Sequence, residues 1–165
     1  MPKHLYLLRH AQSAEKQTAH TDKERELTPL GVKEALIMGT YLFKEKLIPD
    51  IVVSSDAVRA FTTAGIVSDA LHLDLDKVSR EEELYEASVR VLMAFLNQID
   101  DAHSRVLCVG HNPSLSYLAE YITGSEIGDM VTAGLVIIKL NIQSWKEVSQ
   151  GIGSFELYTY PELLE

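Results

Sequence analysis

Cysteine is nearly absent from this chain, because Cys108 is the only one among its 165 residues. A disulfide between two cysteines of the chain is therefore impossible, and a zinc site built from several thiolates is excluded. Cys108 stands inside an apolar run that continues to Val109. We interpret it as a small core residue and not as a nucleophile.

Basic residues are also in short supply: the chain has 15 Lys and Arg against 24 Asp and Glu, a formal net charge of −9. A general nucleic-acid-binding surface is therefore not expected, because neutralising a phosphate backbone takes clustered Lys and Arg. The same balance still permits a small phosphate site, which needs only a few cations placed together.

Long apolar runs are missing as well, and none approaches the length needed to cross a bilayer. The segment from Met1 to Leu8 is too short, and charged too soon, to be a signal peptide. No repeat, low-complexity stretch or linker divides the chain. We expect one domain over residues 1–165, a cytoplasmic location and no membrane partner.

What the sequence does contain is an alternation of short apolar runs and helical patterns, which predicts an α/β fold with three layers and a mostly parallel central sheet. Two of the apolar runs are continuous, as in strands buried on both faces. The expected strands are His4 to Leu8, Ile51 to Ser54, Val106 to Val109, Leu135 to Leu140 and, at an edge, Phe155 to Tyr160. The expected helices run from Thr28 to Lys46, from Asp56 to Leu71, from Glu86 to Ile99, and onward from Pro113.

Polar residues capable of chemistry follow three of these strands. Arg9 and His10 end the first, Arg59 comes shortly after the second, and His111 follows the third. Because parallel strands present their carboxyl ends on one edge of a sheet, these side chains are expected to converge. Two guanidinium groups would hold a phosphoryl group through their planar donor forks. One neutral imidazole could then attack phosphorus while the other donates hydrogen bonds to the oxygens.

Four motifs, in this order along nearly the whole chain, resemble those of a known family. They are Leu8-Arg9-His10-Ala11; Asp22 and Arg25 with Leu27-Thr28-Pro29-Leu30-Gly31; Ser54-Ser55-Asp56-Ala57-Val58-Arg59-Ala60 with Thr63; and Val109-Gly110-His111-Asn112-Pro113. The sequence resembles the histidine phosphatase superfamily, which has the phosphoglycerate-mutase-like fold, and within it the small bacterial SixA-type phosphohistidine phosphatases.

The resemblance implies a role for each matching residue of the convergent group. His10 would become phosphorylated, Arg9 and Arg59 would bind the phosphoryl oxygens, and His111 would stabilise the transition state. Asn112, inside the last motif, is expected to bind substrate.

Other candidates leave alternatives open. Ser13 stands where the family often has a hydroxyl that touches phosphate, or else it caps a helix or turn. Arg25 is expected to bind substrate, paired with Asp22 at the pocket wall, although an exposed ion pair without function would look the same in sequence. Glu86 is our choice of general acid if any carboxylate acts, because it stands at the expected start of a helix beside Tyr85.

We expect neither a metal ion nor an organic cofactor. The remaining histidines show no ligand spacing; they are His4, His20, His72 and His103. The chain lacks the long insertions that form a lid in larger members of the family, so an open site would admit phosphohistidine on a protein surface. The alternatives are a phosphatase of small phosphomonoesters and, in a different class, an inactive module that binds phosphorylated partners.

Overall fold

A six-stranded mixed sheet forms the middle of the molecule in the computed structural model, which describes residues 2–15 and 21–165. The strand order is β3-β2-β4-β1-β5-β6, with β5 antiparallel to both of its neighbours and the other pairings parallel. The strands are β1 (Lys3–Arg9), β2 (Ile51–Ser55), β3 (Val78–Glu81), β4 (Arg105–Gly110), β5 (Leu135–Leu140) and β6 (Gly153–Thr159).

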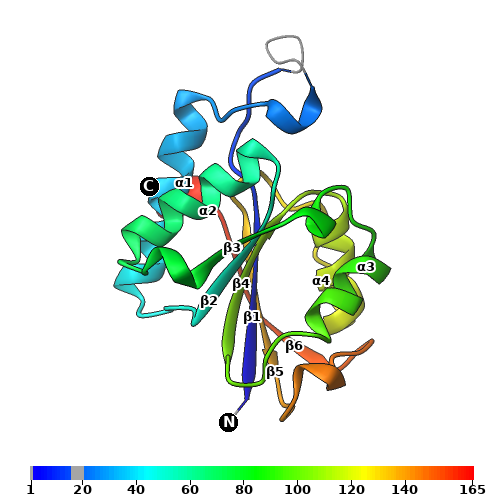
Figure 1. Cartoon of the computed structure of the whole chain (residues 1–165). Coiled ribbons are helices and arrows are strands. Elements are labelled where there is room, and N and C mark those ends of the chain that lie inside the picture. Colours follow the sequence, from blue (N-terminus) through cyan, green and yellow to red (C-terminus); the bar gives the residue numbers. More distant parts are fainter. Residues whose placement is uncertain (1, 16–20) are drawn as a thin grey trace.

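Helices cover both faces of this sheet, which confirms the predicted three-layer α/β arrangement (Figure 1). The helices α1 (Pro29–Lys44) and α2 (Val58–Ala70) lie on one face, and α3 (Val89–Leu96) and α4 (Ser114–Thr123) lie on the other. The short elements are η2 (Asp22–Glu24), η3 (Leu75–Lys77), η4 (Glu82–Leu84), η5 (Trp145–Glu147) and α5 (Pro161–Leu164). Among the residues so described, no helix has the length and apolar character needed to span a membrane.

Each face of the sheet has its own apolar core, since successive residues of a strand point to opposite sides. In β1, Leu5 and Leu7 pack with α3 and α4, whereas Tyr6 and Leu8 pack with α1 and α2. The continuous apolar runs are therefore strands buried on both faces, as predicted. Cys108 belongs to the first of these cores, and burial raises the pKa of its thiol to about 12. That value fits a packing residue and not a nucleophile.

The largest error of the sequence prediction is the missed edge strand β3, whose exposed residues offer no apolar run to detect. Helix starts were also misplaced. The α3 helix begins at Val89, because the side chain of Ser88 accepts a hydrogen bond from the backbone of Val91, so Glu86 precedes the helix. The predicted cap of α1 is confirmed, since Thr28 accepts from the backbone N–H of Gly31.

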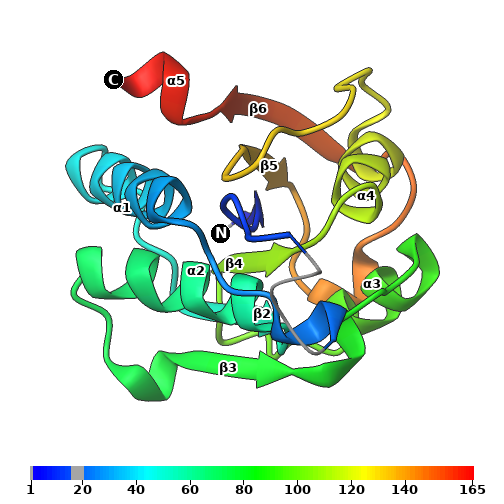
Figure 2. The same cartoon turned by 90° about the horizontal axis from the view of Figure 1, so that it is seen from above.

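The strand order itself creates a crevice between β1 and β4. These two strands are parallel neighbours, yet the chain leaves β1 toward α1 on one face and leaves β4 toward α4 on the other (Figure 2). In open α/β sheets, ligands bind where neighbouring strands diverge in this way at their carboxyl ends. His10 and His111 follow these two strand ends.

The first turn of α1 packs directly on the segment that follows His10. The backbone carbonyl of Gln12 accepts a hydrogen bond from the backbone of Thr28. It lies so close to Gly31 that a Cβ built there would be 2.0 Å from the Gln12 oxygen. Because that neighbour is backbone and not a flexible side chain, only glycine fits. The residues of the family motif around Thr28 thus hold the segment that follows β1 against the first turn of α1.

We expect Gly31→Ala to lower the free energy of unfolding by about 1–3 kcal/mol or more, because the added methyl group must push backbone aside. Gly65→Ala is the matched control: it also lies inside a helix, and nothing lies within 4 Å of its built Cβ. That variant should gain up to about 1 kcal/mol from helix propensity. Urea unfolding of both variants measures the difference. Equal stability for the two would show that the Gln12 contact does not constrain the fold.

Candidate active site

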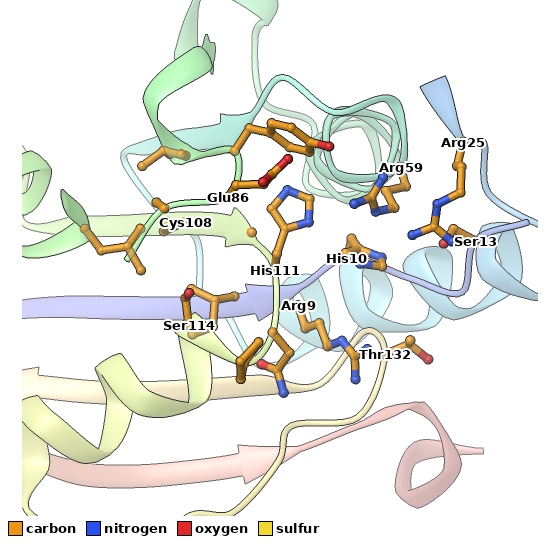
Figure 3. A pocket seen from close by; sticks show the side chains of 18 of the residues that line it. Arg9, His10, Ser13, Arg25, Arg59, Glu86, Cys108, His111, Ser114 and Thr132 are labelled. Carbon is orange, nitrogen blue, oxygen red and sulfur yellow. The ribbon is translucent and has the colours of Figure 1, made fainter. Parts of the chain in front are cut away.

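A cavity of about 480 Å³ opens at the carboxyl ends of β1 and β4 (Figure 3). Every residue that the sequence nominated for the site lines it: Arg9, His10, Ser13, Arg25, Arg59, Glu86, His111 and Asn112. The expected convergence of the strand ends is therefore present in the structure. The roles of the individual residues remain predictions, which the geometry below supports to different degrees.

His10 is buried, only 7% exposed, and its backbone is held on both sides. Its N–H donates to the carbonyl of Gly110, and its carbonyl accepts from the N–H of Ala133. In the ring, Nδ1 lies 2.7 Å from the carbonyl oxygen of Ala11. Since a carbonyl only accepts, Nδ1 carries the proton and Nε2 keeps its lone pair. Burial lowers the pKa of His10 to about 3, helped by His111 and the nearby arginines, so the ring is neutral at pH 7.

His111 faces His10 with the ring centroids 5.3 Å apart (Figure 3). Its Nε2 lies 2.8 Å from the hydroxyl oxygen of Ser55, which also accepts a hydrogen bond from the backbone of Ala57. The Ser55 hydroxyl can therefore donate its proton to Nε2, which favours the tautomer with a proton on Nδ1. Burial lowers the pKa of His111 to about 4, so this ring is also neutral near pH 7.

The two central guanidinium groups are anchored through their terminal nitrogens. Nη1 of Arg9 donates to the carbonyl of Met130 at 2.7 Å. In Arg59, which is 5% exposed, Nη1 donates to the backbone carbonyl of Asp22 at 2.7 Å and Nη2 to its carboxylate at 3.0 Å. The Nε atoms of both arginines are buried and have no hydrogen-bond partner among residues 2–15 and 21–165. Each arginine therefore offers its side-on edge, at Nε, to a ligand.

Within the described part of the chain, three buried nitrogens around one neutral imidazole consequently lack a protein partner: Nε of Arg9, Nε of Arg59 and Nδ1 of His111. Buried polar groups in folded proteins nearly always have hydrogen-bond partners. All three can donate, and two belong to permanently charged groups. A small oxyanion with several acceptor oxygens would satisfy them together, beside Nε2 of His10.

Asn112 has a structural contact at the cavity wall. Its Nδ2 donates to the carbonyl of Met130 at 3.1 Å, and its Oδ1 accepts from the hydroxyl of Ser116. The same hydroxyl accepts from the backbone N–H of Met130. Asn112 thus joins the start of α4 to the carbonyl that anchors Arg9. Its nomination for substrate binding remains a prediction, because both of these side-chain contacts are with the protein.

Ser13 and Arg25 lie on the wall that follows β1. Ser13 pairs with Leu27 in an isolated antiparallel bridge. Nε of Arg25 donates to the carboxylate of Asp22 at 3.0 Å, and Nη1 donates to the carbonyl of Ala14 at 3.0 Å. The predicted pair of Asp22 and Arg25 is therefore present.

Glu86 lies beside His111 at the mouth of the cavity (Figure 3). It is exposed and adopts a left-handed backbone conformation with φ of 52°, between η4 and α3. For a residue with a Cβ that conformation costs about 1–2 kcal/mol. The prediction that Glu86 opens the helix was wrong, because Ser88 takes the cap position. Its place at the cavity agrees with the nomination as general acid but does not test it.

The sequence did not single out several groups that complete the wall. Tyr85 donates from its hydroxyl to the carboxylate of Asp22 at 2.6 Å, and its ring meets His111 edge-on with centroids 5.6 Å apart. Gln12, Ser114 and Thr132 also line the cavity. They come from loops and element ends, where no periodic pattern marks a residue as inward-facing. Over residues 2–15 and 21–165, no group of three or more His, Cys, Asp or Glu side chains is placed to hold a metal ion.

Comparison with known proteins agrees with this geometry. The phosphohistidine phosphatase SixA of Escherichia coli (strain K12) is 26% identical over 133 residues, which cover 80% of this chain and 81% of that one. An uncharacterized protein of Mycobacterium tuberculosis (strain CDC 1551 / Oshkosh) is 27% identical over 165 residues, with coverage of 93% and 99%. A structure of the protein histidine phosphatase SixA complexed with tungstate superposes with a TM-score of 0.84 at 25% identity, covering 98% and 99%.

The fold is accordingly phosphoglycerate-mutase-like. Residues 5–92 match the model of one family, and this range holds three of the four convergent side chains: Arg9, His10 and Arg59. His111 follows β4 outside the matched range, and the fold brings it to the same cavity. The chain belongs to the histidine phosphatase superfamily (branch 1).

Proposed function

We propose that the protein is a metal-independent phosphatase that forms a phosphohistidine on His10 and removes phosphoryl groups from histidine on a phosphotransfer protein. The observation that carries this proposal is a set of three N–H donors that have no partner among the residues the structure describes and that surround the neutral, oriented imidazole of His10. A binding module would need the donors but not the nucleophile, so the inactive alternative explains less of the site.

The first step is attack of Nε2 on phosphorus, in line with the departing group. A bond forms between phosphorus and Nε2, and the bond to the leaving group breaks with its electron pair. Arg9, Arg59 and Nδ1 of His111 donate hydrogen bonds to the three other phosphoryl oxygens as charge develops. The carbonyl of Ala11 holds the Nδ1 proton, which stabilises the ring as positive charge builds on it.

The second step hydrolyses the phosphoenzyme. A water molecule attacks phosphorus, the electron pair of the P–Nε2 bond returns to the ring, and inorganic phosphate departs with the oxygen and both protons of that water. His10 is then neutral again because its site disfavours the charged ring. The same donors serve both steps, since both transfer a phosphoryl group between two nucleophiles at one place.

The choice of phosphohistidine as substrate rests on the leaving group and on the relatives. Breaking phosphohistidine expels an imidazole with a reference pKa of about 6.5, which can leave with little help from an acid. The SixA proteins reported above are named as histidine phosphatases. Phosphatases of small phosphomonoesters remain the second candidate, because Glu86 lies at the cavity and could protonate a poorer leaving group.

The intermediate is tested by trapping. With ³²P-labelled phosphohistidine protein, or an aryl phosphate, as donor, we expect an acid-labile label on His10 after rapid quenching. His10→Ala should take up no label and lose at least about a thousandfold in kcat/KM, because the nucleophile is gone. His103→Ala is the control, since His103 lines a separate groove and should behave as wild type. Label recovered on serine or on Cys108 would refute the mechanism.

Chelation tests the absence of a metal requirement. We expect activity to survive prolonged dialysis against EDTA, because two guanidinium groups and a second imidazole supply the stabilisation that a metal ion would give. The measurement is kcat/KM before and after dialysis, with an aryl phosphate as substrate. Activity that disappears and returns on addition of a divalent ion would overturn the expectation.

The substrate class is tested by comparing leaving groups in two enzymes. In the wild type we expect kcat/KM to be highest for phosphohistidine, intermediate for aryl phosphates and lowest for alkyl phosphates. Glu86→Gln should reduce alkyl phosphate hydrolysis by about 10²–10⁴-fold, the usual contribution of a general acid, and leave phosphohistidine hydrolysis nearly unchanged.

Glu83→Gln is the matched control, because Glu83 is an exposed carboxylate three positions before Glu86 and lines a different groove. It should match the wild type on all three substrates. If the wild type prefers alkyl phosphates and Glu86→Gln removes that preference, the small-phosphoester function is the correct one.

A further inference from the structure

Asp22 contacts three side chains that line the cavity, whereas the sequence predicted only its pair with Arg25. Its carboxylate accepts hydrogen bonds from Arg59 at 3.0 Å, from Arg25 at 3.0 Å and from the hydroxyl of Tyr85 at 2.6 Å. Its backbone carbonyl accepts a further bond from Arg59 at 2.7 Å. One residue therefore receives both terminal nitrogens of a buried arginine that lines the cavity.

These contacts join parts of the chain that are distant in sequence. Asp22 belongs to η2, whereas Arg59 lies in α2 and Tyr85 lies between η4 and α3. Tyr85 in turn packs edge-on against His111. The sequence predicted only the local pair of Asp22 and Arg25, which lie three positions apart, and gave no sign of the two long-range contacts.

The charge of Asp22 is retained throughout the pH range of an assay. The Tyr85 hydroxyl and the arginines lower the pKa of Asp22 to about 2, with the hydrogen bond from Tyr85 as the largest cause. A permanent carboxylate is needed here, because Arg9, Arg25 and Arg59 bring three cations to one cavity. Without a counter-charge their mutual repulsion would disfavour the buried position of Arg59.

The geometry determines which edge of Arg59 faces the ligand. Asp22 takes the end-on edge, formed by Nη1 and Nη2, through its backbone carbonyl and its carboxylate. The side-on edge at Nε has no partner from the part of the protein that the structure describes. A guanidinium is rigid and planar, so fixing one edge fixes the direction of the other.

We propose that Asp22 is a positioning residue of the phosphoryl site, holding the guanidinium of Arg59 end-on so that its Nε edge points at the phosphoryl group. This inference rests on the proposed function, because it assigns Arg59 to phosphoryl oxygens. Asp22 itself touches no substrate. It acts through Arg59, and through Arg25 and Tyr85 to a smaller extent.

The test measures ligand binding and turnover separately. In Asp22→Ala we expect inorganic phosphate and tungstate to bind about 10- to 100-fold more weakly by calorimetry, and kcat/KM for an aryl phosphate to fall by at least as much, as for a lost charge-assisted contact. Asp22→Asn keeps an acceptor oxygen and the backbone carbonyl, so its losses should be smaller. Tyr85→Phe keeps the whole contact to Arg59 and should be affected least.

Lys23→Gln is the matched control. Lys23 lies in the same short helix, pairs with Asp56 at 2.7 Å and lies 5.2 Å from the centroid of the Tyr85 ring, so its loss removes contacts that hold η2 without touching an arginine. Phosphate affinity and kcat/KM should stay at wild-type values. A loss as large as that of Asp22→Ala would mean that η2 simply needs to be held in place, which would overturn the inference.

A double-mutant cycle with Arg59→Ala separates positioning from a general structural role. If Asp22 acts through Arg59, its removal should cost little in a protein that already lacks Arg59, and the double variant should resemble Arg59→Ala. Full additivity of the two losses would overturn the inference. The phosphate affinities keep this result separate from the proposed function: a wild type that binds phosphate but turns over no substrate refutes the function, whereas an active wild type with an unaffected Asp22→Ala refutes the role of Asp22.

Discussion

The burial of His10 against the carbonyl of Ala11 is the constraint on which the rest of the site depends. Burial keeps the imidazole uncharged near pH 7, and the carbonyl fixes its proton on Nδ1, so a lone pair is left on Nε2. A buried ring can hold that state only if no carboxylate stabilises its charged form. The cations beside it have the opposite effect and lower its pKa further. The site therefore combines positive charge with an uncharged imidazole that keeps a lone pair on Nε2, which is the combination that the proposed attack on an anionic phosphoryl group requires.

The fold provides this combination through the divergence of β1 and β4. The two strands pair in parallel up to Arg9 and Gly110, and the chain then departs to opposite faces of the sheet. The backbone bond from His10 to Gly110 extends the pairing by one more residue, so both histidine motifs begin from a shared rigid edge. Arg59 reaches the same edge from the first turn of α2, the helix that follows β2.

Much of this arrangement could be predicted from the sequence, for a physical reason. Strands buried on both faces produce continuous apolar runs, and the residues at their carboxyl ends must meet at one edge. That logic predicts that Arg9, His10, Arg59 and His111 meet at one edge of the sheet, and all four line one cavity in the structure. It could not identify Tyr85 or Ser55 as partners in the site, because a hydrogen bond between distant loops leaves no periodic trace. It missed β3 for a related reason, since an edge strand with exposed residues has no apolar pattern to read.

The two carboxylates near His111, those of Asp22 and Glu86, differ in their contacts and therefore in what they can do chemically. Burial raises the pKa of the Tyr85 hydroxyl, and the neighbouring Asp22 and Glu86 raise it further. That hydroxyl therefore remains a proton donor to its neighbours over the physiological range. Asp22 is held ionised by Tyr85 and by the arginines, and a group with a pKa of about 2 cannot deliver a proton to a leaving group near pH 7. Glu86 is exposed and has no ion-pair partner among the described residues. Of these two carboxylates, Glu86 is therefore the remaining candidate for proton donation, and the need for such a donor depends on the leaving group of the substrate.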